Sequence, residues 1–443
     1  MMESFNPWWR EPRLIELDED YHKWKQSKVK WTPRLLQEID LKPFALHFIY
    51  GPRQVGKTTL LKLLVKLLLD RGVNSKAIFY LRCDQLADFK ELGEILDRYL
   101  EYRRLEGIES SYLLLDEITF PADWWRAIKL RIDLGIFRND LLIFTGSLSM
   151  YAKGEVETFP GRRGSGKDYI LHPLSFRDYL RIRDPGLHSE AKPFKQLSPE
   201  EVLEKTRQLL PWIDQLNTYF KEYLECGGYP LPIKDHLEKG KITEETINTY
   251  LSWIRGDLAK LRRSESIAKR IMRAIIEKQG SIVTWHNLAK EFEVKSHRTV
   301  YTYMDLLEKL LLAKVLHFID PNKGLEIFYK GKKVHLTDPF LYTAISHWCF
   351  TEKPKPHQLA EAVVATHLAR QWPVGYWKNR REVDVVVNLR HQLIGIEVKY
   401  QDRVEGRKAS IGKMKHVITL SKTSYHADPP VAPISAFLAC LEV

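Results

Sequence analysis

The chain has few cysteines and no long apolar run, and each absence excludes a class of protein. No CxxC pair occurs among its four cysteines, which are Cys83, Cys226, Cys349 and Cys440. Neither a zinc site nor a disulfide framework is therefore expected, and this cysteine usage fits a reducing compartment. The N-terminus lacks the apolar segment of a secretory signal, and no stretch reaches the roughly 18 apolar residues that a spanning helix needs. We expect a cytoplasmic protein with no membrane partner.

The composition is otherwise that of an ordinary globular protein with a surplus of positive charge. Of 443 residues, 44% are hydrophobic and 28% are charged, which is too apolar for a disordered chain. Lysine and arginine number 69 against 57 aspartates and glutamates, which gives a formal net charge of +12. Such a surplus favours a polyanionic partner such as nucleic acid, although charge that serves only solubility gives the same count.

The first third of the chain alternates apolar strands with helical patterns. We predict a long helix at about 58–70 and strands at 46–50, 77–81, 112–115 and 141–145. Apolar strands that alternate with helices indicate a parallel sheet covered on both faces. Residues 1 to about 43 are rich in tryptophan and charge. We expect them to form an arm that packs on the rest of the protein through its aromatic side chains.

The segment after the first strand, GPRQVGKT from Gly51 to Thr58, matches the phosphate-binding pattern GxxxxGK[ST] in full. Glycines let the backbone curl so that successive N–H groups face the phosphates, and the helix N-terminus adds positive charge. We expect Lys57 to reach the β- and γ-phosphates and Thr58 to supply an oxygen to Mg²⁺. The predicted ATP-binding residues are Gly51, Pro52, Arg53, Gln54, Val55, Gly56, Lys57, Thr58, Thr59 and Thr145.

Two carboxylates follow the third strand, in the sequence YLLLDE. We predict that Asp116 holds Mg²⁺ through water and that the catalytic Glu117 polarises the attacking water. Two solvated acids at a strand end are the alternative. At the end of the fourth strand, either Thr145 or Ser147 is placed to sense the γ-phosphate, the alternative being a plain turn.

A glycine-flanked arginine pair, Arg162 and Arg163, follows shortly afterwards in the sequence GRRG. A flexible arginine pair is what an arginine finger needs, either within the chain or across a subunit interface, so both are predicted catalytic residues. The alternative is a solvated basic loop. A finger across an interface implies a homo-oligomer, for which a hexameric ring is one form.

At these residues the chain resembles the bacterial and archaeal AAA-type ATPases whose C-terminal half is a domain of unknown function, DUF4143, related to restriction-endonuclease-like folds. The motifs GPRQVGKTTL, YLLLDEI, LLIFTGS, GRR, HPLSFRDYL and CGGYP follow that family in order. The resemblance covers most of the chain from about 44 onward and does not include the arm. It implies an α/β fold class: a P-loop AAA-type ATPase core with a helical lid, a winged-helix domain and a restriction-endonuclease-like α/β domain. The expected limits are an arm at 1–43, the core at 44–184, the lid at 185–264, the winged helix at 265–340 and the nuclease-like domain at 341–443.

The winged-helix expectation also rests on three helical patterns, from about 265, at 284–292 and after Ser296. A hairpin around Gly331, from about 327 to 335, would form the wing. DNA-binding residues are predicted on the third helix and on this wing, namely Lys295, Arg298, Lys332 and Lys333. The alternative is a module that contacts another domain or subunit.

A third constellation lies near the C-terminus, where we predict strands at 383–388 and 393–398. Asp384, Glu397 and Lys399 fall on the polar face of this hairpin with the spacing of the PD-(D/E)xK nucleases, and they are predicted catalytic residues. The resemblance supplies an extra acid on a preceding helix, Glu361. Two or three acids at such a site bind Mg²⁺ or Mn²⁺, so Glu361, Asp384 and Glu397 are the predicted metal ligands. A degenerate nuclease fold that only binds its partner is the alternative.

Together these patterns predict a magnesium-dependent ATP hydrolase that binds DNA and acts in DNA processing, as a motor or remodeller, with branched DNA as one substrate. A regulatory switch ATPase, whose winged-helix and C-terminal domains only bind DNA or protein, is the alternative of a different class. An ATPase that remodels proteins is a third.

Overall fold

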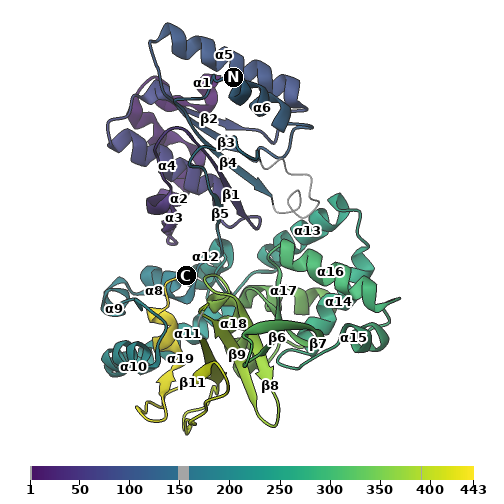
Figure 1. Ribbon diagram of the computed structural model, residues 1–443. Coiled ribbons are helices and arrows are strands. Elements are labelled where there is room, and N and C mark those ends of the chain that lie inside the picture. Colours follow the sequence, from purple (N-terminus) through teal and green to yellow (C-terminus); the bar gives the residue numbers. More distant parts are fainter. Residues whose placement is uncertain (1, 148–158, 391) are drawn as a thin grey trace. The chain divides into compact units, whose positions relative to one another are not determined.

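The computed structural model describes residues 2–147, 159–390 and 392–443 (Figure 1). The chain divides into two compact units, Met1–His172 and Pro173–Val443. Among the described residues, no helix combines the length and the apolar character needed to cross a membrane.

The first unit is built on a parallel sheet of five strands in the order β2-β3-β4-β1-β5 (Figure 1). Its strands are β1 (Ala45–Gly51), β2 (Ile78–Arg82), β3 (Tyr112–Asp116), β4 (Leu141–Ser147) and β5 (Asp168–Ile170). The helices between them are α4 (Lys57–Asp70), η3 (Ser75–Ala77), α5 (Phe89–Leu105) and α6 (Trp125–Asp133). The four predicted strands and the predicted helix are confirmed. The short β5 was missed because only three residues carry it and none of them is buried.

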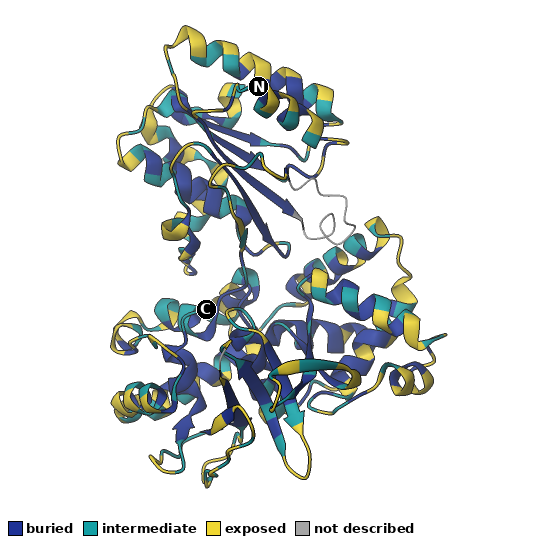
Figure 2. Ribbon diagram, viewed as in Figure 1, coloured by how far each residue is buried: buried dark blue, intermediate teal, exposed yellow. Residues whose placement is uncertain are grey.

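All seven residues of β1 are buried, and the strands form the dark interior of this unit in Figure 2. A strand buried on both faces needs apolar side chains at every position rather than at alternate ones, which is why β1 reads as a continuous apolar run. Because the strands are parallel, their C-terminal ends meet at one edge of the sheet, where the P-loop follows β1 and two acids end β3.

The N-terminal arm covers the edge of this sheet that β2 forms. It consists of α1 (Met2–Phe5), η1 (Pro7–Trp9), η2 (Pro12–Leu17), α2 (Glu19–Gln26) and α3 (Leu35–Glu38). The Asn6 side chain accepts a hydrogen bond from Tyr80 N at 2.7 Å and donates one to Tyr80 O at 3.0 Å, as a neighbouring strand would. The predicted aromatic packing of the arm is confirmed, because Trp8 and Trp9 are both buried. The arm thereby satisfies backbone groups that an edge strand would otherwise leave open.

The second unit contains a mixed sheet of seven strands in the order β12-β11-β10-β9-β8-β6-β7. Its strands are β6 (Ala313–Asp320), β7 (Leu325–Leu336), β8 (Val374–Lys378), β9 (Glu382–Asn388), β10 (Leu393–Val398), β11 (Met414–Ser421) and β12 (Val431–Pro433). The helices before β6 are α8 (Phe176–Arg183), α9 (Pro185–Glu190), α10 (Pro199–Gln208), η4 (Leu210–Trp212), α11 (Ile213–Cys226), α12 (Pro230–Lys239), α13 (Glu244–Lys260), α14 (Glu265–Glu277), α15 (Trp285–Glu291) and α16 (His297–Lys309). Those after β7 are α17 (Pro339–Cys349), α18 (Pro356–Leu368) and α19 (Ile434–Cys440).

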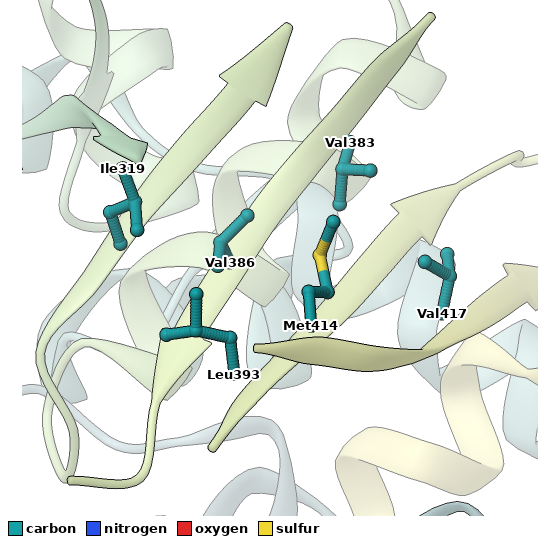
Figure 3. Packing of buried hydrophobic residues seen from close by; sticks show 6 residues of the cluster. All are labelled: Ile319, Val383, Val386, Leu393, Met414 and Val417. Atoms are coloured by element: carbon teal, nitrogen blue, oxygen red, sulfur yellow. The ribbon is translucent and has the colours of Figure 1, made fainter. Parts of the chain in front are cut away.

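An apolar cluster joins four strands of this sheet (Figure 3). Its buried members are Ile319, Val383, Val386, Leu393, Met414 and Val417. Gly395 on β10 allows this packing, because a Cβ atom there would lie 2.8 Å from the Met414 sulfur. The cluster holds β6 and β9–β11 in register, and of the acids of the predicted nuclease-like site β9 carries Asp384 and β10 carries Glu397.

Two sequence-based expectations about this unit need correction. The predicted hairpin around Gly331 does not form, since β7 runs through that residue and the turn between β6 and β7 lies at 321–324. The strands expected to form a separate wing also belong to the C-terminal sheet, because β6 pairs in parallel with β8 through His317–Gly375 and Phe318–Tyr376. The predicted domain limit at 340 therefore cuts through one sheet, and the residues of the predicted lid, 185–264, belong to the second unit.

Candidate functional site

The loop between β1 and α4 has the curled backbone that the phosphate-binding pattern predicts. Gly56 precedes α4 with a φ of 100°, and Gln54 has a φ of 58°, so both occupy the left-handed region. Gly51 is constrained by space instead, because a Cβ atom there would lie 2.6 Å from the carbonyl oxygen of Leu171. The loop ends at the N-terminus of a 14-residue helix, and the N-terminus of a helix favours an anion.

Lys57 lies under this loop with only 5% of its surface exposed. Its Nζ donates to the carbonyl oxygens of Gly51 and Pro52, each at 3.1 Å, and lies 3.8 Å from Glu117 Oε1. The two carbonyls hold the ammonium at the mouth of the loop. The structure therefore brings Lys57 and Glu117 together, as the motifs predict, from sequence positions 60 residues apart.

Asp116 is the centre of a buried hydrogen-bond network at the end of β3. Its Oδ2 accepts from Thr58 Oγ1 at 2.7 Å and from the Tyr80 hydroxyl at 2.9 Å, and its Oδ1 accepts from Thr145 Oγ1 at 2.5 Å. Thr145 Oγ1 also accepts a hydrogen bond from the backbone N–H of Glu117 at 2.8 Å. Thr145 thus contacts the Asp116 carboxylate and the Glu117 backbone, while its predicted role as a phosphate sensor stays a prediction.

The donor set fits the predicted magnesium ion. Thr58 and Asp116 offer hydroxyl and carboxylate oxygens, the hard ligands that Mg²⁺ prefers in proteins. Tyr80, which the sequence analysis missed, orients the same carboxylate; its position at the end of the predicted strand 77–81 was the available signal. Burial raises the pKa of Glu117 while the Lys57 charge opposes that rise. A carboxylate with a raised pKa is a stronger base than an exposed one.

The arginine pair lies at the other end of the sheet. Arg163 Nη2 lies 2.6 Å from Asp168 Oδ1, and its Nε donates to Leu46 O at 3.3 Å. Leu46 is five residues before Gly51, or about 16 Å along an extended strand, so Arg163 cannot reach the P-loop of its own chain. The predicted role within the chain is wrong for Arg163. A role across a subunit interface stays a prediction for Arg163 and for Arg162, whose Nε lies 2.6 Å from Asp133 Oδ1.

The C-terminal acids do not form the predicted arrangement. Lys333, predicted to bind DNA from the wing, is completely buried, and its Nζ lies 2.8 Å from Glu361 Oε1 and 3.1 Å from Asp384 Oδ1. A third acid, Glu382, lies 2.7 Å from the same ammonium. Burial alone would lower the pKa of Lys333, but the nearby carboxylates outweigh burial and raise it. Burial raises the pKa of Glu361 to about 7.

Glu397 pairs elsewhere, so the predicted metal trio is not assembled. Its Oε2 lies 3.0 Å from Arg407 Nε and its Oε1 lies 3.2 Å from Lys399 Nζ. Within the described ranges, no group of three or more His, Cys, Asp or Glu side chains is arranged to hold a metal ion. The prediction that Glu361, Asp384 and Glu397 share a metal is therefore corrected. The predicted hairpin itself is confirmed, because β9 and β10 pair antiparallel.

Of the predicted DNA-binding residues, only Lys295 and Arg298 are exposed, both near the N-terminus of α16. Lys332 is 7% exposed, its Nζ donates to Phe328 O at 2.7 Å, and it lies over the Trp285 ring. The prediction that Lys332 and Lys333 contact DNA is wrong, because a buried ammonium cannot approach a phosphate. Neighbouring lysines on an assumed wing were expected to be solvated, whereas the second half of β7, from Lys332 to Leu336, is buried.

Comparisons with known proteins support the predicted P-loop site, but they match the C-terminal half to a different family from the expected one. Residues 44–180, which include the P-loop and both acids at the end of β3, match the family model described as "AAA domain". Residues 217–350 match a domain of unknown function, DUF8612, in place of the expected DUF4143. No curated protein matches the chain.

Several solved structures match this chain at low identity and with TM-scores of 0.40 or less. The Aeropyrum pernix ORC2 protein is 14% identical with a TM-score of 0.40, and the match covers 76% of this chain and 98% of that one. The A. pernix ORC1 protein in complex with DNA is 16% identical with a TM-score of 0.30, covering 76% of this chain and 96% of that one. The Thermotoga maritima RuvB Holliday junction branch migration motor is 15% identical with a TM-score of 0.27, covering 78% and 98%.

Proposed function

We propose that the protein is a magnesium-dependent ATP hydrolase. The observation that carries this proposal is the hydrogen bond between Thr58 and Asp116, made beside a P-loop lysine that lies 3.8 Å from Glu117. A curled loop, a lysine, a hydroxyl and two acids are the parts that phosphoryl transfer to water requires. The AAA domain match over the same residues supports ATP as the nucleotide.

Each residue has a defined task in this proposal. The N–H groups of the loop and the Lys57 ammonium bind the phosphates and stabilise the negative charge that grows on them. Asp116 orients Thr58, and a bound Mg²⁺ would neutralise phosphate charge there. Glu117 accepts the proton of the attacking water, a task for which its raised pKa suits it. Thr145 holds the Glu117 backbone through a hydrogen bond from its N–H.

The test is a comparison of ATP binding with ATP turnover in a Glu117→Gln variant. Glutamine keeps the shape of the side chain but cannot accept the proton, so we expect normal ATP binding and hydrolysis slowed by at least about 100-fold. Glu94→Gln, at an acid that is 70% exposed on α5, is the matched control and should hydrolyse ATP normally. Turnover at the wild-type rate in Glu117→Gln would refute the assignment.

We further infer that ATP hydrolysis is coupled to DNA, as in a motor or remodeller that acts in DNA processing. Two observations support the coupling to DNA. The formal net charge is +12, and the cations Lys295 and Arg298 are exposed at the start of α16, the third helix of the group α14–α16. ATP turnover measured with single-stranded, duplex, forked and four-way DNA is the test. No stimulation by any form would direct the search to a protein partner.

The alternative, a switch ATPase whose C-terminal half only binds its partner, is favoured by one observation. Lys333 lies among the acids that a nuclease would use for metal, with 1% of its side chain exposed. Because of this lysine, we propose that the C-terminal unit binds DNA without cutting it. A cleavage assay on the same four DNA forms with Mg²⁺ or Mn²⁺ tests this, and cleavage that Asp384→Ala abolishes would refute it.

A further inference from the structure

A buried lysine connects the N-terminal arm to the ATP site. Lys62 lies on α4 one helical turn after Thr58, so both side chains leave the same face of that helix. The Lys62 side chain is only 3% exposed, and its Nζ lies 2.8 Å from Oδ2 of Asp18, the residue that precedes α2 of the arm. The arm therefore supplies the counter-ion of a cation that is buried within the first unit.

The same ammonium group contacts the hydrogen-bond network of Asp116. Lys62 Nζ lies 3.3 Å from the centre of the Tyr80 ring, and the hydroxyl of that ring donates to Asp116 Oδ2 at 2.9 Å. Burial lowers the pKa of Lys62, and nearby carboxylates oppose that decrease. These carboxylates are, in order of effect, Asp18, Asp20 and Asp116. Lys62 thus lies within electrostatic reach of two arm acids and of the acid that is predicted to hold Mg²⁺.

The charges around Lys62 indicate what loss of the arm acids would do. Removal of the partner of a buried charge is strongly destabilising, so the ammonium group is drawn to an acid that remains within reach. Of the three acids, Asp116 is the one that does not belong to the arm. An ammonium group bound to Asp116 would repel a divalent cation and occupy an oxygen ligand of Mg²⁺.

We propose that Asp18 and Asp20 are positioning residues for the ATP site, which hold the Lys62 ammonium away from Asp116 and so preserve the affinity of that site for Mg²⁺. Both acids act through Lys62 and not as metal ligands. Because it concerns the binding of Mg²⁺ with ATP, this role rests on the proposed function. The arm lies outside residues 44–180, which match the AAA domain, so the role is not part of that match.

The test measures how much Mg²⁺ strengthens nucleotide binding to the full-length protein. The non-hydrolysable ATP analogue AMP-PNP is titrated with Mg²⁺ and with EDTA in a calorimeter, and the ratio of the two dissociation constants is the gain that Mg²⁺ provides. Asp18→Asn/Asp20→Asn should reduce this gain by at least about 5-fold, the lower end of typical coupling between sites. Asparagine caps a helix as well as aspartate does, so α2 keeps its capping hydrogen bond. A merely structural effect would weaken binding equally under both conditions.

Two further variants separate the effect of charge from that of structure. Addition of Lys62→Met to the double variant removes the released ammonium group and should restore the wild-type gain. Glu11→Gln/Glu19→Gln is the matched control, because it neutralises two exposed acids of the arm. This control should leave the gain unchanged.

Two results would overturn the proposal and leave the proposed function intact. One is an unchanged gain in Asp18→Asn/Asp20→Asn. The other is a reduced gain that Lys62→Met does not restore, because the ammonium group would then not compete with Mg²⁺. A wild type that gains nothing from Mg²⁺ would instead refute the proposed function, and this role with it.

A measurement on the wild type keeps the proposal testable if the double variant does not fold. Coupling is reciprocal, so bound Mg²⁺ should in turn strengthen the docking of the arm. Hydrogen exchange of residues 18–26 should therefore be slower with Mg²⁺ and AMP-PNP than with AMP-PNP alone. Equal exchange rates would contradict the proposal.

Discussion

The hydrogen bonds that attach the arm to β2 predict a specific non-additive effect on stability. The carbonyl oxygen of Ile78 accepts two indole N–H groups, from Trp8 at 3.0 Å and from Trp9 at 2.9 Å. Trp8→Phe or Trp9→Phe removes one donor and leaves the carbonyl with the other. We therefore expect each single change to cost about 0.5–1.5 kcal/mol for the hydrogen bond, plus a packing loss for the smaller ring.

The double variant differs from both singles because it leaves the Ile78 carbonyl buried without any of its indole donors. An unsatisfied buried acceptor costs about 1–3 kcal/mol. The loss of unfolding free energy in Trp8→Phe/Trp9→Phe should therefore exceed the sum of the two single losses by about 1–3 kcal/mol. Independent sites usually deviate from additivity by only about 0.3–0.5 kcal/mol. The packing losses belong to each ring and largely cancel in the cycle.

Urea denaturation followed by far-ultraviolet circular dichroism gives the four free energies of the cycle. Hydrogen exchange of the peptide that contains β2 reports whether the loss is local to the sheet edge. Trp125→Phe, at a half-buried indole on α6, is the control for the change in ring size and should alter stability little. Additive losses would refute the reasoning, since the shared carbonyl would then carry no energetic weight.

Three further predictions concern the ATP site, acid stability and the surface of α16. Tyr80→Phe removes a hydrogen bond to Asp116, so we expect a higher Mg²⁺ concentration for half-maximal ATP hydrolysis with little change in the saturated rate, as a magnesium titration would reveal. Asp235 accepts hydrogen bonds from a lysine and two threonines, which outweigh burial and lower its pKa below the ordinary 3.8. The ionised Asp235 side chain therefore stabilises the fold above pH 3.8, and this stabilisation is lost as the pH falls below that value. The melting temperature of Asp235→Asn should be lower than that of the wild type at pH 7. It should also depend less on pH between 3 and 5. Lys295→Ala/Arg298→Ala should lower the salt slope of DNA binding by about 0.9 for each lost phosphate contact, and an unchanged slope would mean that this surface faces protein.

The ATP site was predictable because its parts depend on local sequence. A P-loop needs glycine at a left-handed position and a lysine one residue later, and such a requirement is visible within eight residues. The acids of β3 were found because an apolar run ends at them, and parallel strands place their ends together. The role of Tyr80 and the docking position of the arm were not predicted, since no spacing in the sequence ties Tyr80 to Asp116 or the arm to the edge of β2.

The sequence by itself determined the two kinds of chemistry available to this chain, phosphate binding near Gly51 and clustered acids near Asp384, together with β1–β4, α4 and the β9–β10 hairpin. Only the tertiary structure decided which charges meet. Lys333 was expected to be a solvated wing residue, but β7 belongs to the C-terminal sheet. Its Nζ lies 2.8 Å from Glu361, which is 28 residues away in sequence, and 3.1 Å from Asp384, which is 51 residues away. Arg163 looked like a catalytic finger, but its carbonyl oxygen accepts a hydrogen bond from Leu46 N at the start of β1. Residue periodicity predicts which face of an element is buried, but the partner that covers that face is chosen by contacts between distant segments.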